Sequence, residues 1–263
     1  MARIALVTGF SRRAGIAAGI VERLLADGLS VLATGWAPHD ADMPWGSDAE
    51  GNAALAEALD PGDGRLRYID ADLEDPEAPA QLVAATVDAF GAIDVLVAAH
   101  ARSSHEGLAT VTAAELDRCW AVNARASVLL AQQFGNAVDA DRGNGRIVFF
   151  TSGQHLEAMG DEIAYAVSKG AIQQMTASVS DQLIDQGITV NCVNPGPVDT
   201  GWAQGDFHAA VASAFPSGRW GTPQDIANLV SFVVSPEGAW LTGQTINAEG
   251  GFRRGAVALP PER

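Results

Sequence analysis

The sequence lacks a long apolar run and contains few cysteines. No uninterrupted apolar stretch reaches the ~20 residues that a membrane-spanning helix requires. The first seven residues lead directly into a strand-like run, so we expect no secretory signal peptide. Cys119 and Cys192 are the only cysteines, which favours two buried thiols over a disulfide or a metal site. These absences predict a cytoplasmic protein that neither spans a membrane nor binds a metal ion.

Positive charge is also scarce. The chain has 16 lysines and arginines against 32 aspartates and glutamates, a formal net charge of −16. This balance disfavours nucleic acid and anionic membrane surfaces as partners. It does not restrict a small substrate, because a local basic site can lie within an acidic protein. A salt-rich environment and a need for solubility explain the acidity equally well.

The sequence does contain a regular alternation of short apolar runs and longer helical patterns. Strands are expected over residues 3–7, 30–34, 67–70, 94–99, 146–151, 189–194 and 244–247, and helices over 15–27, 76–90, 112–138, 163–186 and from 222 onward. Asp75 is placed to cap the second helix, and Thr112 with Glu115 forms a capping box for the third. The Asp/Pro/Gly-rich segment 36–52 is expected to be a surface loop, and residues 253–263 show no periodicity.

The apolar strands are continuous rather than alternating, which is typical of parallel strands covered on both faces. The 263 residues, 48% of them hydrophobic, suffice for such a core. The sequence therefore predicts an α/β protein with one Rossmann-type domain over residues 1–263. Its doubly wound parallel sheet has about seven strands, with helices on both faces.

Two motifs indicate chemistry. The first strand ends in a turn containing Gly9 and Gly15 before a helix, an arrangement that lets backbone N–H groups bind a pyrophosphate. An ordinary strand-to-helix turn is the alternative. The second motif is Ser152, followed by Tyr165 and Lys169 one helical turn apart. A neighbouring ammonium lowers the pKa of a phenol from its usual value near 10, which would make Tyr165 an acid/base; a surface pair on a helix is the alternative.

With these motifs the chain resembles the short-chain dehydrogenase/reductase family over almost its full length, in a 3-oxoacyl-reductase-like branch. The resemblance implies a hydride transfer between a nicotinamide cofactor and a carbonyl or secondary alcohol. It implies that Tyr165 transfers the proton and that Ser152 binds the substrate oxygen. It also implies that Lys169 binds the ribose and lowers the Tyr165 pKa, and that Asn123 holds the water of a proton relay. The implied cofactor-binding residues are Gly9, Ser11, Arg12, Arg13, Gly15, Ile16, Asp72, Leu73, Ala99, Tyr165, Lys169, Pro195, Gly196, Val198 and Thr200. Family members usually form tetramers, so a homotetramer is expected.

The chain departs from the family pattern in its cofactor loop. Five residues separate Gly9 from Gly15 where three are common, and Ala17 replaces the last glycine. The longer loop is similar to the enoyl reductase branch, but that branch has a wider Tyr–Lys spacing. Residues 98–101 read Ala-Ala-His-Ala where the family usually has Asn-Asn-Ala-Gly. This last difference puts the packing around the nicotinamide in doubt.

The residues after the second strand bear on cofactor choice. NAD-preferring members place an acid there, but Gly35 and Trp36 occupy those positions and no acid follows before Asp40. Arg12 and Arg13 could instead meet a 2′-phosphate. The prediction is therefore NADP, with NAD possible and both arginines in solvent as the alternative.

The substrate pocket is expected to be lined by residues 102–107, 154–162 and a lid over about 201–218. Trp202, Phe207 and Phe215 would make the lid apolar, or else pack in the core. His105, His155 and Glu157 could contact a polar substrate or lie in solvent. Asp181 lies on an acidic helix face that would repel an acidic carrier protein, which favours a free small carbonyl or alcohol as substrate.

Two other classes of function remain open on this fold. One is a cofactor-sensing protein without activity, although a sensor has no need of the set Asn123, Ser152, Tyr165 and Lys169. The other is a cofactor-free lyase of the dehalogenase kind. Such proteins lack the glycine turn and carry arginine in place of Lys169.

Overall fold

The chain forms one parallel sheet of seven strands in the order β3-β2-β1-β4-β5-β6-β7. The structure is a computed structural model that describes residues 2–139, 142 and 145–257. The strands are β1 (Ile4–Thr8), β2 (Ser30–Gly35), β3 (Leu66–Asp70), β4 (Val95–Ala98), β5 (Arg146–Phe150), β6 (Thr189–Asn194) and β7 (Thr245–Asn247). The strand order reverses between β1 and β4, which opens a crevice at the carboxyl ends of these strands. The predicted doubly wound sheet is confirmed.

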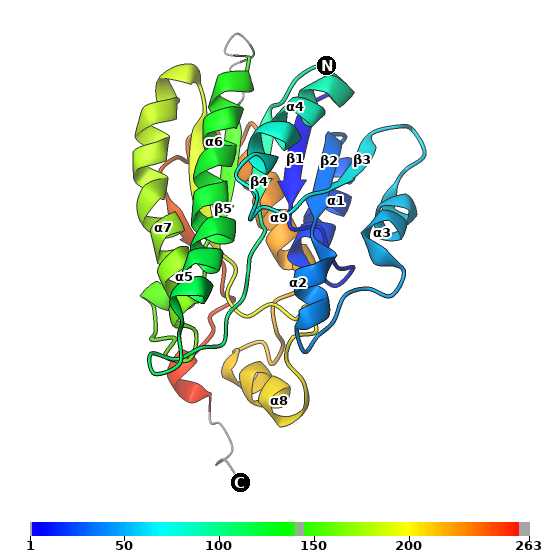
Figure 1. Ribbon diagram of the computed structural model, residues 1–263. Coiled ribbons are helices and arrows are strands. Elements are labelled where there is room, and N and C mark those ends of the chain that lie inside the picture. The colour runs from blue at the N-terminus through cyan, green and yellow to red at the C-terminus, as the bar shows by residue number, and fades with distance from the viewer. Residues whose placement is uncertain (1, 140–141, 143–144, 258–263) are drawn as a thin grey trace.

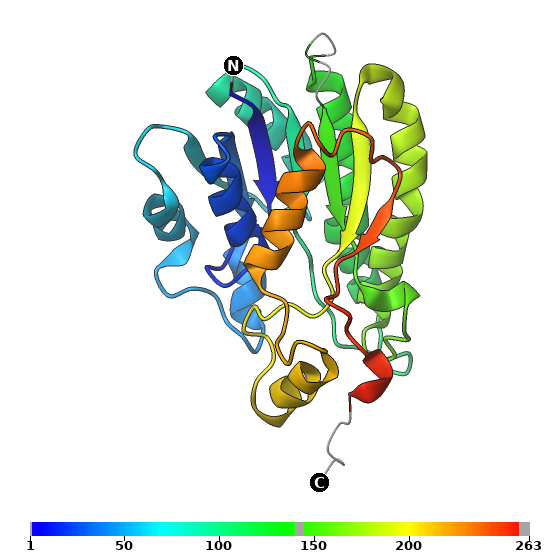
Figure 2. The same ribbon diagram turned by 180° about the vertical axis from the view of Figure 1, so that it is seen from behind.

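Helices cover both faces of the sheet (Figures 1 and 2). One face carries α1 (Ile16–Ala26), α3 (Gly51–Leu59) and α9 (Pro223–Val234), and the other carries α4 (Ala78–Phe90), α6 (Ala126–Ala137) and α7 (Ile163–Leu183). Shorter elements lie toward the carboxyl ends of the strands: α2 (Ala37–Asp42), α5 (Ala113–Cys119), α8 (Gly205–Ala214) and the 3₁₀ helices η3 (Gly153–His155) and η5 (Arg254–Ala256). A further 3₁₀ turn, η4 (Ile184–Gln186), ends α7.

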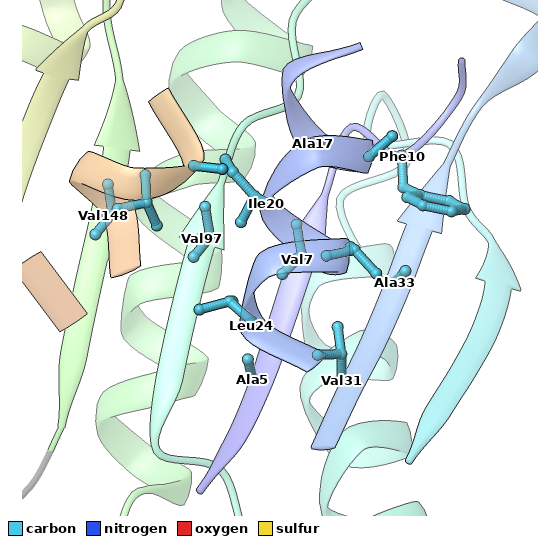
Figure 3. Packing of buried hydrophobic residues seen from close by; sticks show 14 of the residues in the cluster. Ala5, Val7, Phe10, Ala17, Ile20, Leu24, Val31, Ala33, Val97 and Val148 are labelled. Atoms are coloured by element: carbon cyan, nitrogen blue, oxygen red, sulfur yellow. The ribbon is translucent and has the colours of Figure 1, made fainter. Parts of the chain in front are cut away.

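Alternate residues of each strand enter different cores, because successive side chains point to opposite faces of a sheet. In β1, Ala5 and Val7 pack toward α1, where they meet Ile20 and Leu24 (Figure 3). Leu6, between them, belongs to the second core beneath α4 and α6. Both cores lie against the same strands, so the carboxyl ends of those strands are held rigidly.

Three expectations about helices were wrong in detail. Segment 36–52 is not only a loop: it contains α2, with Pro38 in its first turn, and leads into α3. The cap of α4 is Glu77 rather than Asp75, whose carboxylate instead accepts a hydrogen bond of 2.9 Å from the Glu77 N–H. This local turn delays the helix by two residues. Residues 253–263, expected to be irregular, contribute η5.

The long helix expected over 112–138 is interrupted. A π-helical turn, η1 (Trp120–Arg125), separates α5 from α6 and contains Asn123. Such turns are frequent at functional sites. The predicted capping box forms only in part: Thr112 Oγ1 accepts a hydrogen bond from the Glu115 N–H, but the Thr112 N–H donates to Glu106 and the Glu115 carboxylate pairs with Arg102. A reciprocal capping box of Thr222 and Asp225 does form at the start of α9.

Both cysteines are buried free thiols, as predicted. Among the described residues, no helix has the length and apolarity needed to cross a membrane. In the same part of the chain, no group of three or more His, Cys, Asp or Glu side chains is arranged to hold a metal ion.

Candidate active site

The β1–α1 turn places backbone rather than side chains at the crevice. Gly9 has φ +85°, and a Cβ there would lie 2.8 Å from the backbone of Ala99 at the end of β4. Gly15 occupies the N-cap position of α1 without a side-chain cap, and the first turn of that helix has no acidic residue. The helix therefore presents its positive end to the crevice with its N–H groups uncapped by a side chain.

Two adjoining cavities occupy the crevice. The first has a volume of about 320 Å³. The predicted cofactor residues in its wall are Gly9, Ser11, Arg12, Gly15, Ile16, Asp72, Leu73, Ala99 and Thr200. The second has a volume of about 390 Å³. Its wall contains the predicted residues Ser152, Tyr165, Pro195, Gly196 and Val198. The cavities share Arg12, Ile16, Trp45, Ser103 and Thr200, so they form one continuous groove.

Tyr165 faces the larger cavity together with Ser152. Burial raises the pKa of Tyr165 to about 12; the negative charge of Glu162 acts in the same direction, and a hydrogen bond with Ser152 opposes it. The sequence-based expectation of a lowered pKa is wrong for this state of the protein. The reason is burial of the phenol, and Lys169 is not among the causes of the shift in the Tyr165 pKa.

Lys169 is the only lysine in the chain and is 2% exposed. Its Nζ donates a hydrogen bond of 3.0 Å to the Phe150 carbonyl and lies 5.7 Å from the centre of the Tyr165 ring. Burial lowers the pKa of Lys169 to about 8. The amine lies behind Tyr165 and belongs to the wall of neither cavity.

Asn123 is fully buried, and protein groups occupy both ends of its amide. Its Oδ1 accepts from the Arg102 N–H at 2.7 Å, and its Nδ2 donates to the Arg102 carbonyl at 3.0 Å and to Ser168 Oγ at 2.8 Å. The side chain thus fixes the β4–α5 loop to α7. These contacts assign the Asn123 side chain a positioning role within the site.

Arg12 lies between the two cavities. Its Nε is 3.2 Å from an Asp40 carboxylate oxygen, and Nη1 donates to the Thr200 carbonyl at 2.7 Å. Asp40 also accepts hydrogen bonds from Ser11 Oγ and Trp45 Nε1. Arg13, in contrast, is exposed and lines neither cavity; its backbone N–H donates to Asp48.

The substrate-pocket predictions hold in part. Residues 102–107 and 154–162 contribute Ser103, His105, Glu157, Ala158, Met159 and Glu162 to the larger cavity. His155 lies outside it, where its Nε2 is 3.1 Å from Asn247 Oδ1. Of the lid aromatics, Trp202 lines the cavity, whereas Phe215 is 5% exposed and packs in a small core with Trp220. Phe207 contacts the Trp202 ring and lines neither cavity.

Several site residues escaped the sequence analysis. Asp40 and Trp45 lie in the segment interpreted as a surface loop, and Arg254 lies in the tail without periodicity. Gly153 leaves space for the Arg254 guanidinium at the larger cavity, because a Cβ at position 153 would lie only 2.6 Å from it. His100 is also a site residue. Its position in the segment that departs from the family pattern was the only sequence signal for it, and that signal predicted no role.

A family profile and individual relatives of known sequence point to the same protein family. A family profile described as enoyl-(acyl carrier protein) reductase matches residues 9–253. An uncharacterized oxidoreductase from Bacillus subtilis, YjdA, is 36% identical over 254 residues, covering 96% of this chain and 98% of its own length. The short-chain reductase protein NovJ from Streptomyces niveus is 33% identical, covering 94% and 93%.

Solved structures agree with this result. A short-chain dehydrogenase/reductase from Serratia marcescens superposes with a TM-score of 0.83 at 31% identity, over 95% of this chain and 97% of that one. A blue fluorescent protein from a metagenomic library, solved in complex with NADPH, gives a TM-score of 0.82 at 31% identity over the same shares. By its length-spanning relatives and its fold, the chain belongs to the short-chain dehydrogenase/reductase family of oxidoreductases.

Proposed function

We propose that the protein interconverts a small carbonyl compound and its secondary alcohol with NADP(H), using Tyr165 as general acid and base. The observation that carries this proposal is that Ser152 and Tyr165 face a cavity continuous with the glycine-lined groove. A substrate oxygen there can reach a proton donor while its carbon faces the adjoining groove. Such general acid–base catalysis contributes about 10²–10⁴-fold to a rate.

The groove fits a dinucleotide. The close approach of Gly9 to Ala99 leaves no room for a side chain in the turn, so a ligand there would meet main chain. The uncapped start of α1 suits a pyrophosphate, and Asp72 and Leu73 line the same cavity. Ala99, Pro195, Gly196, Val198 and Thr200 would hold the nicotinamide half. When bound, the cofactor supplies the hydride that the carbonyl carbon accepts.

The chain's own groups handle the proton. Tyr165 keeps its proton at neutral pH, because its pKa is raised, and can give it to the carbonyl oxygen. Ser152 holds that oxygen by a hydrogen bond. Lys169 donates one of its three N–H groups to the Phe150 carbonyl and can offer another to a ribose hydroxyl, while Asn123 holds the β4–α5 loop against α7.

Arg12 supports the choice of NADP(H). It is the arginine of the loop that enters the groove, and one similar protein has been solved with NADPH. Asp40 and Thr200 hold its guanidinium, so it is already ordered. NAD(H) is the second candidate, because Asp40 places a carboxylate at the same groove.

We also propose a homotetramer. Trp120 on η1 is 51% exposed and Val167 on α7 is 56% exposed. These helices lie side by side on one face of the molecule (Figure 1). An apolar pair on adjoining helices suits a contact with a second copy.

The test is NADPH oxidation, followed by absorbance, with a panel of small ketones. Tyr165→Phe should lose at least ~99% of the activity, because general acid catalysis contributes about 10²–10⁴-fold. The matched control is Tyr68→Phe, which removes the chain's only other tyrosine, packed against Phe10 outside both cavities. Retention of a tenth or more of the activity in Tyr165→Phe would contradict the acid/base role. Dinucleotide binding without turnover of any carbonyl would favour a sensor.

A further inference from the structure

Glu162 occupies an unusual position for a carboxylate. It is the N-cap residue of α7, yet its side chain accepts no capping hydrogen bond from that helix. It lines the larger cavity instead, and its Oε1 lies 3.4 Å from His105 Nδ1. Tyr165, three residues further along the chain, lines the same cavity.

The cations of the cavity already have partners. Arg12 pairs with Asp40, and Arg254 makes a two-pronged hydrogen bond with Glu249. Glu157, at the mouth of the cavity, lies 3.9 Å from Arg254. For Glu162, the described ion-pair partner is His105, a group that carries charge only when protonated. The cavity wall beside Tyr165 is therefore negative.

Aromatic rings line the same cavity as this carboxylate. Trp45 meets the His105 ring edge-on with ring centres 6.4 Å apart, and both residues line the larger cavity. Trp202 and Phe252 line it as well. A cavity that contains both a carboxylate and aromatic rings suits an organic ammonium group, which can gain an ion pair and cation–π attraction there.

We propose that the substrate is an amino ketone, or the corresponding amino alcohol, whose ammonium group binds Glu162. This inference rests on the proposed function and names its substrate class. Because Glu162 and Tyr165 line one cavity, the amine and the carbonyl belong to the same small molecule. In the reaction the carbonyl carbon gains the hydride and its oxygen gains the Tyr165 proton. The ammonium keeps its protons and is unchanged.

The pKa values are consistent with such a ligand. Burial raises the pKa of Glu162, because it disfavours the charged carboxylate. That same charge raises the pKa of Tyr165. A bound ammonium would relieve both effects, because an adjacent opposite charge stabilises a carboxylate.

The test uses three methyl ketones that differ in one substituent: aminoacetone, hydroxyacetone and pyruvate, which carry positive, zero and negative charge. Each is assayed by NADPH oxidation at a pH where the amine is protonated. We expect kcat/KM for aminoacetone to exceed that for hydroxyacetone at least about tenfold, a difference of ~1.4 kcal/mol. Pyruvate should be the poorest of the three substrates.

Glu162→Gln should reduce the aminoacetone-to-hydroxyacetone ratio to within about threefold of unity, because the amide keeps the shape and loses the charge. The matched control is Glu22→Gln, an equal charge change at an exposed position of α1 outside both cavities, which should keep the ratio. An unchanged ratio in Glu162→Gln, or a wild-type preference for hydroxyacetone or pyruvate, overturns the inference.

Failure of the proposed function gives a different result. If no ketone is reduced, binding of 1-amino-2-propanol and of 1,2-propanediol to the NADP⁺-loaded protein is measured by calorimetry. Tighter binding of the amine, lost in Glu162→Gln, supports the ammonium site without the reaction. Equal or undetectable binding of both alcohols overturns it.

Discussion

The Nδ1 atom of His100 lies 2.7 Å from the Thr8 hydroxyl, and its Nε2 lies 2.9 Å from the Val122 carbonyl. A carbonyl can only accept, so Nε2 carries the hydrogen and Nδ1 accepts from Thr8. The imidazole is buried and lines the smaller cavity. It therefore joins the start of the glycine turn to the π-helical turn that carries Asn123.

His100→Ala should destabilise the protein by about 2–4 kcal/mol. The change leaves the Thr8 hydroxyl and the Val122 carbonyl without this partner, at about 1–3 kcal/mol for a buried group, and also opens a cavity. Urea unfolding measures the loss. His100→Asn, which keeps a donor and an acceptor, should recover part of it. A loss below ~0.5 kcal/mol in His100→Ala would mean that the bridge contributes no stability.

The same imidazole should make the protein sensitive to acid. Burial is the largest cause that lowers the pKa of His100 to about 3, and the charge of Lys169 acts in the same direction. Between that value and the unfolded value near 6.5, the unfolded chain binds one more proton, so stability falls as the pH falls. The slope reaches ~1.4 kcal/mol per pH unit for one proton. His100→Asn should show a shallower slope between pH 6.5 and 3 than the wild type, and an equal slope would refute this origin. Exposed His155→Asn is the control.

The sheet was predictable because its signals are local. Continuous apolar runs mark β1, β4 and β5, and Thr222 with Asp225 marks the start of α9 through a reciprocal capping box. The π-helical turn was not predictable, because apolar spacing does not distinguish it from an α-helix. Nor was α2, where Pro38 occurs in a segment otherwise rich in loop residues.

The residues proposed as catalytic were identified by type and spacing, which do not predict their electrostatics. Lys169 and Tyr165 share a helix face, as their spacing requires. The direction of the Tyr165 pKa shift depends first on burial of the phenol and then on the charge of Glu162. Both depend on how the elements pack around α7, which the sequence does not give. The contact of Lys169 with the Phe150 carbonyl, which joins α7 to β5, was not predictable for the same reason. The sequence likewise does not distinguish Arg12 from Arg13, because only the conformation of the loop shows that Arg12 lines the groove and Arg13 does not.

Arg12→Ala should reduce the preference for NADPH over NADH about tenfold, whereas Arg13→Ala should leave it within about twofold. Arg12 alone of the two lines the groove, and a lost charge-assisted contact of ~1.4 kcal/mol corresponds to tenfold. The measurement is kcat/KM for each cofactor with one ketone. An equal effect of both variants would contradict the assignment.

Cofactor binding should take up a proton through Lys169. Burial lowers the pKa of this amine to about 8, and an anionic dinucleotide favours its charged form. Near pH 8.5, where about three-quarters of an amine with a pKa of about 8 is neutral, calorimetry in buffers of different ionisation enthalpy should give an uptake of up to about three-quarters of a proton. Lys169→Met should bind the cofactor more weakly and lose this uptake. Wild-type uptake that persists in the variant would place the titrating group elsewhere.

Glu162→Gln should shift the pH dependence of alcohol oxidation toward lower pH. In that direction Tyr165 acts as the base, so the rate rises as its phenol ionises. Burial raises the pKa of Tyr165 to about 12, with Glu162 and Cys119 adding to the shift and the Ser152 hydrogen bond opposing it. Removing the Glu162 charge should move the rising limb of the pH–rate profile down by roughly one pH unit, the lower end of the effect of a nearby charge.

The measurement uses a neutral alcohol at saturating NADP⁺, so that no substrate charge contributes. Glu157→Gln is the matched control, because Glu157 lines the same cavity and is not among the causes of the Tyr165 shift. A limb that stays in place in Glu162→Gln, or moves equally in both variants, would mean that Glu162 does not act on the tyrosine.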